Sequence, residues 1–184
     1  MPQSPEFRFH HGSLALSFAG TVGDRASTPI ERLGDHHALV RWLKASGLAA
    51  RGAHLEINRQ GFESALALRE TIWRIADAIA NDRTPSKADV AALNLAAKKW
   101  YVVPQLDAKM LATTAASTSL DDALGAIALS AIDTFGRERE HLRRCNLDEC
   151  GAIFLDPGTG RPRKWCTMER CGNRAKVRAF RERA

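Results

Sequence analysis

Four cysteines stand at a spacing that suits a metal site. Four residues separate Cys145 from Cys150 and Cys166 from Cys171, and fifteen residues separate the two pairs. Each close pair can form a turn that presents two sulfurs, and a hairpin between the pairs would bring all four together tetrahedrally. The chain has 184 residues and no other cysteine, yet these four fall within 27 positions. The spacing therefore predicts one Zn²⁺ per chain, bound by Cys145, Cys150, Cys166 and Cys171.

A zinc ion held by four protein thiolates has no position left for water, so it would be structural rather than catalytic. In a module this small the metal supplies ~10–16 kcal/mol of apparent binding energy, which is in effect folding energy. Disulfides would need an oxidising compartment, and the sequence shows no export signal. An iron–sulfur cluster and unligated thiols are the remaining alternatives.

Basic residues accompany the cysteines. Residues 137–184 contain 13 Lys and Arg against 7 Asp and Glu, whereas residues 1–136 contain 14 of each. The whole net charge of +6 therefore lies in the cysteine-bearing region, and it falls to +4 once four thiolates bind one Zn²⁺. An Arg-rich helix fixed by zinc suits phosphate contact and the base edges of a major groove. The candidate nucleic-acid contacts are Arg161, Arg163, Lys164, Arg174, Lys176, Arg178, Arg181 and Arg183. A solvated basic surface, or one that docks an acidic protein, is the alternative.

The residues between the cysteine pairs are typical of a hairpin. Residues 152–155 resemble a strand, and residues 156–159 place Pro and Gly at the two centres of a type II turn. Residues 163–165 are then expected to return towards the second pair. Phe154 and Trp165 would supply the small core that such a module needs.

A helix is expected from Asn173 to Arg183. Helical spacing places Arg174, Arg178 and Arg181 on one face. Val177 and Phe180 fall elsewhere, and we expect them to pack back on Phe154 or Trp165.

The neutral region, residues 1–136, is expected to be mostly helical. Apolar residues recur every three or four positions from Phe62 to Ala80. Capping residues predict three more helices. Asp35 would cap a helix over residues 36–46. Ser86 would cap a helix that ends at about Lys99, with these residues facing inward: Ala88, Val90, Leu93 and Ala97. Ser119 would cap a helix that runs towards Arg144, with these residues facing inward: Leu120, Leu124, Ile127, Ala131, Ile132 and Phe135.

Two segments of this region favour strands. Leu14 to Val22 alternates larger and smaller residues, and Tyr101 to Thr114 can form a hairpin. The expected fold is α+β: a mainly helical domain over residues 1–136 with a few short strands, then a zinc-bound β-hairpin plus helix over residues 137–184. Sensing or dimerisation is the expected role of the larger domain.

Nothing in residues 1–136 predicts catalysis. The two histidines of each pair, at positions 10–11 and 36–37, are expected to point to different faces, so we expect solvated or loop histidines rather than ligands of one metal. Asp24 and Arg25 favour a local ion pair. No phosphate-binding loop, nucleophile elbow or His-Glu-x-x-His motif is present, so the chain is not expected to be an enzyme.

The composition excludes other broad classes. Hydrophobic residues make up 45% and charged residues 26%, as in soluble globular proteins and unlike disordered chains. No apolar run approaches the ~20 residues that span a bilayer. We therefore expect a cytoplasmic protein without membrane contact.

The cysteine region also resembles a known family. Residues 171–174 read Cys-Gly-Asn-Arg, preceded by Lys164-Trp165-Cys166, and resemble the bacterial CGNR zinc finger. The first cysteine pair with Phe154 and Asp156 is similar to that family's Cys-x4-Cys…Phe-x-Asp signature.

The neutral region resembles the ABATE domain that usually precedes this finger and is described as a stress-induced transcription regulator. Residues 14–21 resemble its opening strand, where Leu-Asp-Phe-x-Asn-Thr is expected, but Ser17 and Gly20 replace the Asp and the Asn. The resemblance implies a zinc-binding, DNA-binding regulator, with the finger as reader and the larger domain as sensor of a small-molecule effector. Because a single small finger reads few bases, we expect specific binding to need a homodimer formed through residues 1–136. The alternatives are a protein-interaction module whose basic finger docks an acidic partner, and a small-molecule sensor.

Overall fold

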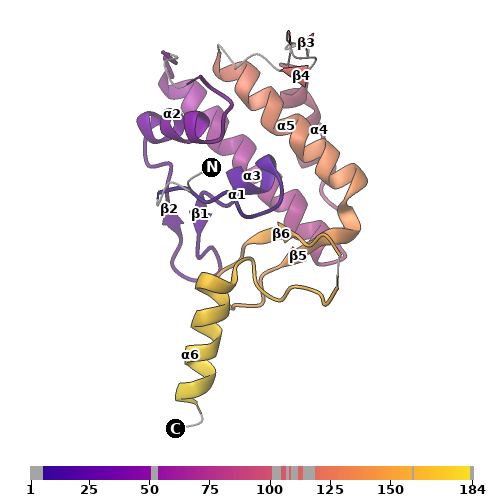
Figure 1. Cartoon of the computed structure of the whole chain (residues 1–184). Helices are drawn as coiled ribbons and strands as arrows, with labels where there is room; N and C mark the ends of the chain where they lie inside the picture. Colours follow the sequence, from indigo (N-terminus) through magenta and orange to yellow (C-terminus); the bar gives the residue numbers. More distant parts are fainter. Residues whose placement is uncertain are drawn as a thin grey trace.

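The computed structural model of the chain describes residues 6–50, 54–100, 105–106, 108, 112–113, 119–158 and 160–182. The elements are α1 (Leu14–Ala19), β1 (Val22–Gly23), β2 (Ile30–Glu31), α2 (His36–Ala45), α3 (Arg59–Ala80), α4 (Lys87–Ala97), β3 (Gln105–Leu106), β4 (Ala112–Thr113), α5 (Leu120–Arg137), a 3₁₀ turn (Arg139–His141), β5 (Leu142–Arg144), β6 (Ile153–Leu155), a π-helical turn (Met168–Gly172) and α6 (Asn173–Arg181). The helices form a bundle, the hairpin β5–β6 lies across one end of it, and α6 projects away from the body (Figure 1). This arrangement confirms the expected α+β fold.

The bundle is built around α1, α3 and α5, which pack on one another, with α4 against both long helices. Trp42 is fully buried, and its ring centroid lies 4.9 Å from that of Phe18. Gly125 lets α5 approach the end of α4, because a Cβ there would lie 2.7 Å from the backbone nitrogen of Trp100. No helix among the described residues is long and apolar enough to cross a membrane.

The capping predictions are confirmed. The side chains of Asp35, Ser86 and Ser119 accept hydrogen bonds from backbone N–H groups in the first turns of α2, α4 and α5. The strongly periodic helix α3 begins at Arg59, three residues before the apolar stripe, because Asn58 caps it.

The expected strand over Leu14–Val22 is wrong. Ser13 accepts a hydrogen bond from the N–H of Leu16, and residues 14–19 form α1. Every residue of α1 after Leu14 is buried, so the smaller residues at alternate positions are packed in the core rather than exposed on a solvent face. Because α1 is enclosed on all sides, its pattern does not have the period of an amphipathic helix.

Two details of the predicted helical faces are also wrong. Ala88 and Val90 on α4 and Ile132 on α5 are exposed, although all three are expected in the core from the sequence. Val90 is 40% exposed and Ile132 is 37% exposed. Helix α5 ends at Arg137 instead of continuing towards Arg144, and a 3₁₀ turn leads into β5.

The hairpin expected within Tyr101–Thr114 is confirmed where the chain is described, because β3 and β4 pair antiparallel. The other residues of that prediction, except Ala108, lie outside the described part of the chain.

The strand β6 is confirmed, but its partner was predicted wrongly. It pairs antiparallel with β5, which precedes the first cysteine, with Arg143 opposite Phe154. Residues 163–165 form no returning strand, and bends lie at residues 164–166. Gly158 has a φ of 71°, the sign that the third position of a type II turn requires.

The hairpin β5–β6 is packed on the bundle. Leu142 and Ile153 form a buried cluster with Leu16 of α1 and Ala76 of α3. The indole N–H of Trp73 donates to the carbonyl of Gly151 over 3.2 Å. Backbone bonds add to this junction, from the N–H of Arg25 to the Cys150 carbonyl and from the N–H of Leu155 to the His11 carbonyl.

Candidate metal centre and basic helix

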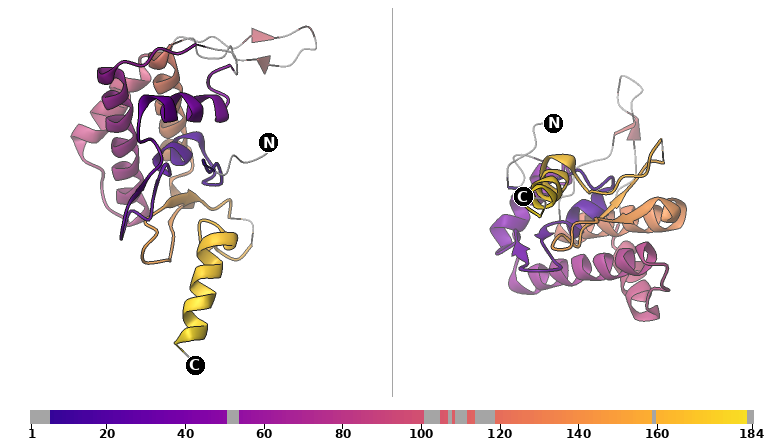
Figure 2. Two further views of the ribbon diagram at one scale, coloured as in Figure 1. Left: turned by 90° about the vertical axis from the view of Figure 1, so that its left-hand side faces the viewer. Right: turned by 90° about the horizontal axis from the view of Figure 1, so that it is seen from below.

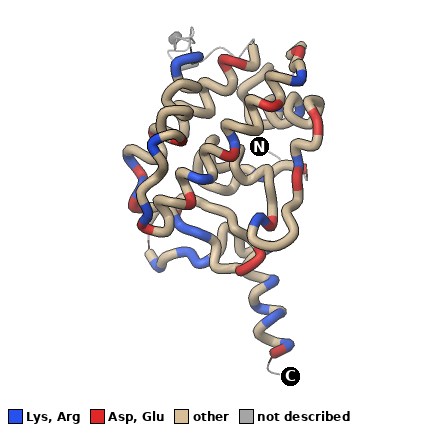
Figure 3. Tube along the Cα trace, turned by 180° about the vertical axis from the view of Figure 1, so that it is seen from behind, with Lys and Arg blue, Asp and Glu red and all other residues tan. Residues whose placement is uncertain are grey.

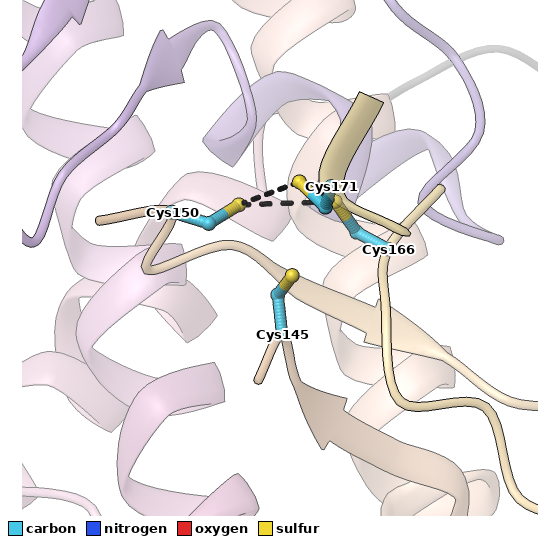
Figure 4. Close-up of side chains that lie close together, drawn as sticks. All are labelled: Cys145, Cys150, Cys166 and Cys171. Carbon is cyan, nitrogen blue, oxygen red and sulfur yellow. Dashed lines mark hydrogen bonds between the residues drawn. The ribbon is translucent and has the colours of Figure 1, made fainter. Parts of the chain in front are cut away.

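The four cysteines meet at one buried point between the β5–β6 hairpin and the base of α6 (Figure 4). All four sulfurs lie within 4.8 Å of one another. Cys150 Sγ is 3.8 Å from Cys166 Sγ and 3.6 Å from Cys171 Sγ, and the latter two are 3.5 Å apart. A tetrahedron of sulfurs about 2.3 Å from a central zinc has edges of about 3.8 Å. The three distances among Cys150, Cys166 and Cys171 fit such a site and are far too long for disulfides, and Cys145 Sγ lies within 4.8 Å of each of them.

Short backbone turns hold the first pair. The N–H of Cys150 donates to the carbonyl of Leu147 over 2.9 Å, which closes the turn between the two cysteines. The N–H of Cys145 donates to Ala152 at the end of the β5–β6 ladder. The N–H of Asn146 donates to the Lys164 carbonyl, and this bond joins the first cysteine segment to the second.

The second pair is held by the π-helical turn that starts α6. The N–H groups of Cys171 and Gly172 both donate to the carbonyl of Thr167 over 3.1 Å. A Cβ on Gly172 would lie 2.7 Å from the Met168 sulfur and 3.2 Å from the Trp165 ring, so glycine fits the crowded site best. The first turn of α6 is therefore fixed to the metal site through Cys171.

The thiols influence one another's ionisation strongly. Hydrogen bonding with Cys150 and Cys166 lowers the pKa of the Cys145 thiol. Hydrogen bonding with Cys145 and Cys150 raises the pKa of the Cys166 thiol. Four thiolates this close repel one another, and a divalent cation at their centre removes that conflict. The donor set, its burial and its spacing thus fit a structural Zn²⁺, as predicted.

Arg170 lies beside this site, and sequence reasoning missed it. Its guanidinium donates to Asp24 over 2.6 Å. Burial alone would lower the pKa of Arg170, but the charges of Asp24 and then of Cys171 and Cys150 outweigh burial and raise it. Such a cation partly offsets the negative charge of a zinc–thiolate centre.

The local ion pair expected between Asp24 and Arg25 is wrong. Asp24 is buried, has a φ of 47°, and pairs with Arg170 and Arg174 of the finger. Arg25 instead forms an ion pair with Glu70 over 2.7 Å, and its guanidinium lies over the Trp73 ring. The partners lie up to 150 residues away in sequence, so no local signal pointed to them.

The three arginines Arg174, Arg178 and Arg181 share one side of α6, as predicted. They line an open hollow of about 620 Å³ together with Val177 and several acidic residues. Arg174 lies 3.4 Å from Asp24, and Arg178 pairs with Asp148 at 3.1 Å and with Glu149. The arginine side chains of these pairs are 43% and 44% exposed, so solvent screening weakens the pairs.

The other candidate nucleic-acid contacts differ in the contacts that their side chains make within the protein. Arg161, Lys164, Lys176 and Arg181 are exposed. Arg163 is also exposed, but its guanidinium makes internal contacts: it donates to the Cys166 carbonyl over 2.6 Å and lies over the Phe154 ring. Arg183 lies outside the described residues.

The expected packing of α6 is wrong. Val177 is 50% exposed and Phe180 is 72% exposed, so neither reaches Phe154 or Trp165. Ala175 packs against the cysteine cluster in their place. The left view of Figure 2 shows α6 extending away from the rest of the chain.

The histidines divide unexpectedly. His36 and His37 are exposed, as predicted, whereas His11 is only 3% exposed, with its ring against Gly20. Burial, then the charges of His10 and nearby arginines, lower the pKa of His11 to about 3. His11 is therefore a neutral core residue, and Gly20 leaves room for its ring.

Two protein-family models match the chain. The ABATE model, described as "Putative stress-induced transcription regulator", matches residues 12–138. The CGNR zinc finger model matches residues 141–184. No curated protein matches the chain.

Proposed function

The chain belongs to the ABATE family and carries a CGNR zinc finger, and from this premise we propose that it is a non-enzymatic, cytoplasmic transcription regulator that binds duplex DNA through α6. Zinc has a structural role in this proposal, because it fixes the first turn of α6 and leaves the rest of the helix exposed. The helical domain carries the finger and would transmit any regulatory signal to it.

The projection of α6 from the body is the observation that carries the proposal. Basic residues are spread along this helix and the adjoining loop. In Figure 3 the Lys and Arg positions, drawn in blue, recur along the projecting segment. The helix has nine residues and is about 14 Å long. A major groove is ~12 Å wide and ~8.5 Å deep, and admits one such helix.

The side chains proposed to contact phosphate are five of the exposed ones, Arg161, Lys164, Lys176, Arg178 and Arg181. Arg178 would exchange its carboxylate partners for phosphate at little cost, because a surface ion pair contributes ~0–1 kcal/mol. Arg174 could likewise exchange its partner Asp24, 3.4 Å away, for a phosphate. We give Arg163 an internal supporting role because of its contacts with Cys166 and Phe154.

A helix of this length reads few base pairs, so we infer that specific binding uses two copies of the chain on a two-fold related site. The oligomeric state on DNA, measured by sedimentation, tests that inference.

A salt series tests DNA binding directly. Zinc-loaded full-length protein is titrated with mixed-sequence duplex DNA and with single-stranded RNA at several salt concentrations. Five phosphate contacts predict that log K falls with log salt at a slope of about −4 to −5 on the duplex. The double variant Lys176→Ala/Arg181→Ala should make the slope shallower by about 2, because it loses two phosphate contacts.

The matched control is Arg59→Ala/Lys87→Ala, which removes the same charge from exposed positions on the bundle and should leave the slope unchanged. A flat salt dependence, no retardation at low salt, or tighter binding to RNA would contradict the proposal.

A further inference from the structure

Two apolar side chains are exposed on the projecting helix. Phe180 is 72% exposed, more than any other large hydrophobic residue in the described part of the chain, and Val177 is 50% exposed. Scattered single apolar residues on a surface need no explanation, but these two are neighbours on one helix in a strongly basic segment.

The two residues lie on the same side of α6 as its arginines. At about 100° per residue, Val177 and Phe180 are about 60° apart around the helix axis. Arg181 and Arg174 flank Val177 at about 40° and 60° on its other side. The opposite side carries Ala175, which packs against the cysteine cluster. The outward face of α6 therefore combines an apolar pair with cationic neighbours.

Charge indicates what covers this face. Four arginines line the hollow beside Val177, against three acidic residues, Glu149, Glu169 and Glu182. Lys176 adds a further exposed positive charge to the helix. A polyanion complements such a surface, and the dimensions of α6 suit a major groove. On the floor of that groove every base pair displays hydrogen-bond donors and acceptors, and A·T pairs add an apolar group, the C5-methyl of thymine.

We propose that Val177 and Phe180 contact thymine C5-methyl groups in the major groove and so give the finger a preference for thymine. The inference rests on the proposed function, because it assigns specificity to the same helix. The arginines position α6 between the phosphates, and the apolar pair recognises the methyl groups on the base edges.

The test compares duplexes that differ only in that methyl group. Zinc-loaded full-length protein is titrated with 20-base-pair (~two-turn) alternating A·T duplex and with the same duplex containing deoxyuridine in place of thymidine. Burying one methyl group contributes about fourfold in affinity, so two contacts predict a preference of roughly fifteenfold for the thymine duplex.

The variants assign the preference to the helix. Phe180→Ala should lower the affinity for the thymine duplex about fourfold and leave the affinity for the uracil duplex unchanged. Val177→Ala/Phe180→Ala should bind both duplexes equally, at the wild-type affinity for the uracil duplex. Leu95→Ala is the matched control, because Leu95 is 64% exposed on α4, away from the finger. Circular dichroism checks that each variant keeps its fold.

Each outcome decides the question. Equal binding of both duplexes by the wild type would overturn the inference while DNA binding stands. No binding to either duplex at low salt would overturn the proposed function as well. A thymine preference that persists in the double variant, or a wild-type dimer in solution that the double variant loses, would overturn the assignment of this face to DNA.

Discussion

The two ends of the zinc finger contrast in their surroundings. The hairpin β5–β6 and the cysteine turns are buried against the bundle, with Phe154 fully enclosed and the backbone of Cys150 and Leu155 bonded to the helical domain. Helix α6 contains no buried residue. The first end supports the structure, and the second is free for recognition. Substitutions at the two ends should therefore affect stability and binding separately.

Zinc connects these two ends, so its removal should have the largest effect. Chelation or Cys166→Ser should abolish the finger fold and release α6, because the metal supplies ~10–16 kcal/mol to such a module. The finger also buries Leu16 and Ala76 of the bundle, so the melting temperature of the helical domain should fall too. Limited proteolysis and circular dichroism measure both effects.

Restoring zinc after chelation is the control and should recover both signals. A finger that keeps its protease resistance without zinc would contradict the account. A helical domain whose melting temperature is unchanged would show that the two regions fold independently.

Two phenylalanines test the contrast with the same chemical change. Phe154→Ala should destabilise the protein by about 3–5 kcal/mol, because it leaves a cavity in the cysteine core. Phe180→Ala should change the free energy of unfolding by less than about 0.5 kcal/mol, because that ring is mostly exposed. Denaturant unfolding of the two zinc-loaded variants measures both values. Similar losses would show that α6 is packed against the body after all.

The ion pair at the junction should have a smaller effect. Asp24→Asn leaves the partly buried Arg170 guanidinium without its carboxylate, at a cost of about 2–3 kcal/mol. Glu63→Gln removes a carboxylate from the exposed i,i+4 pair with Arg59 and should cost less than about 0.5 kcal/mol. Chemical denaturation compares them, and equal costs would mean that Asp24 contributes nothing special to the junction.

Acidic pH should lower the free energy of unfolding, because His11 is buried as a neutral side chain. The unfolded side chain has an ordinary pKa of 6.5 and the folded one a pKa of about 3. Below pH 6.5 the unfolded chain therefore binds the proton first, and stability falls by about 1.4 kcal/mol per pH unit until about pH 3. By pH 5 the loss is about 2 kcal/mol.

The variant His11→Asn cannot titrate and should lack this loss. Comparing unfolding free energies of variant and wild type from pH 7.5 to 5 isolates the effect from protonation of the zinc thiolates, which both proteins share. Parallel pH profiles would contradict the assignment of His11 as a buried neutral residue.

Local signals in the sequence predicted much of this structure. Asp35, Ser86 and Ser119 cap helices through bonds to residues three positions ahead, and such short-range chemistry can be read from the chain. The matched cysteine spacing likewise predicted the metal site. Helix α1 was missed because it is enclosed on every side and shows no amphipathic period.

What the sequence could not show depends on contacts between distant segments. Asp24 finds Arg170 only because the bundle and the finger dock. The partner of β6 is β5, which lies before the cysteines, and nothing local distinguishes it from residues 163–165. The exposure of Phe180 follows from the direction of α6, which the metal site and the junction set together.

X-ray absorption at the zinc edge tests the central claim most directly. The purified full-length protein should contain one zinc per chain, with four sulfur ligands at about 2.3 Å and no nitrogen or oxygen ligand. Fewer than four sulfurs, an additional light-atom ligand, or protein that folds without bound metal would contradict the account.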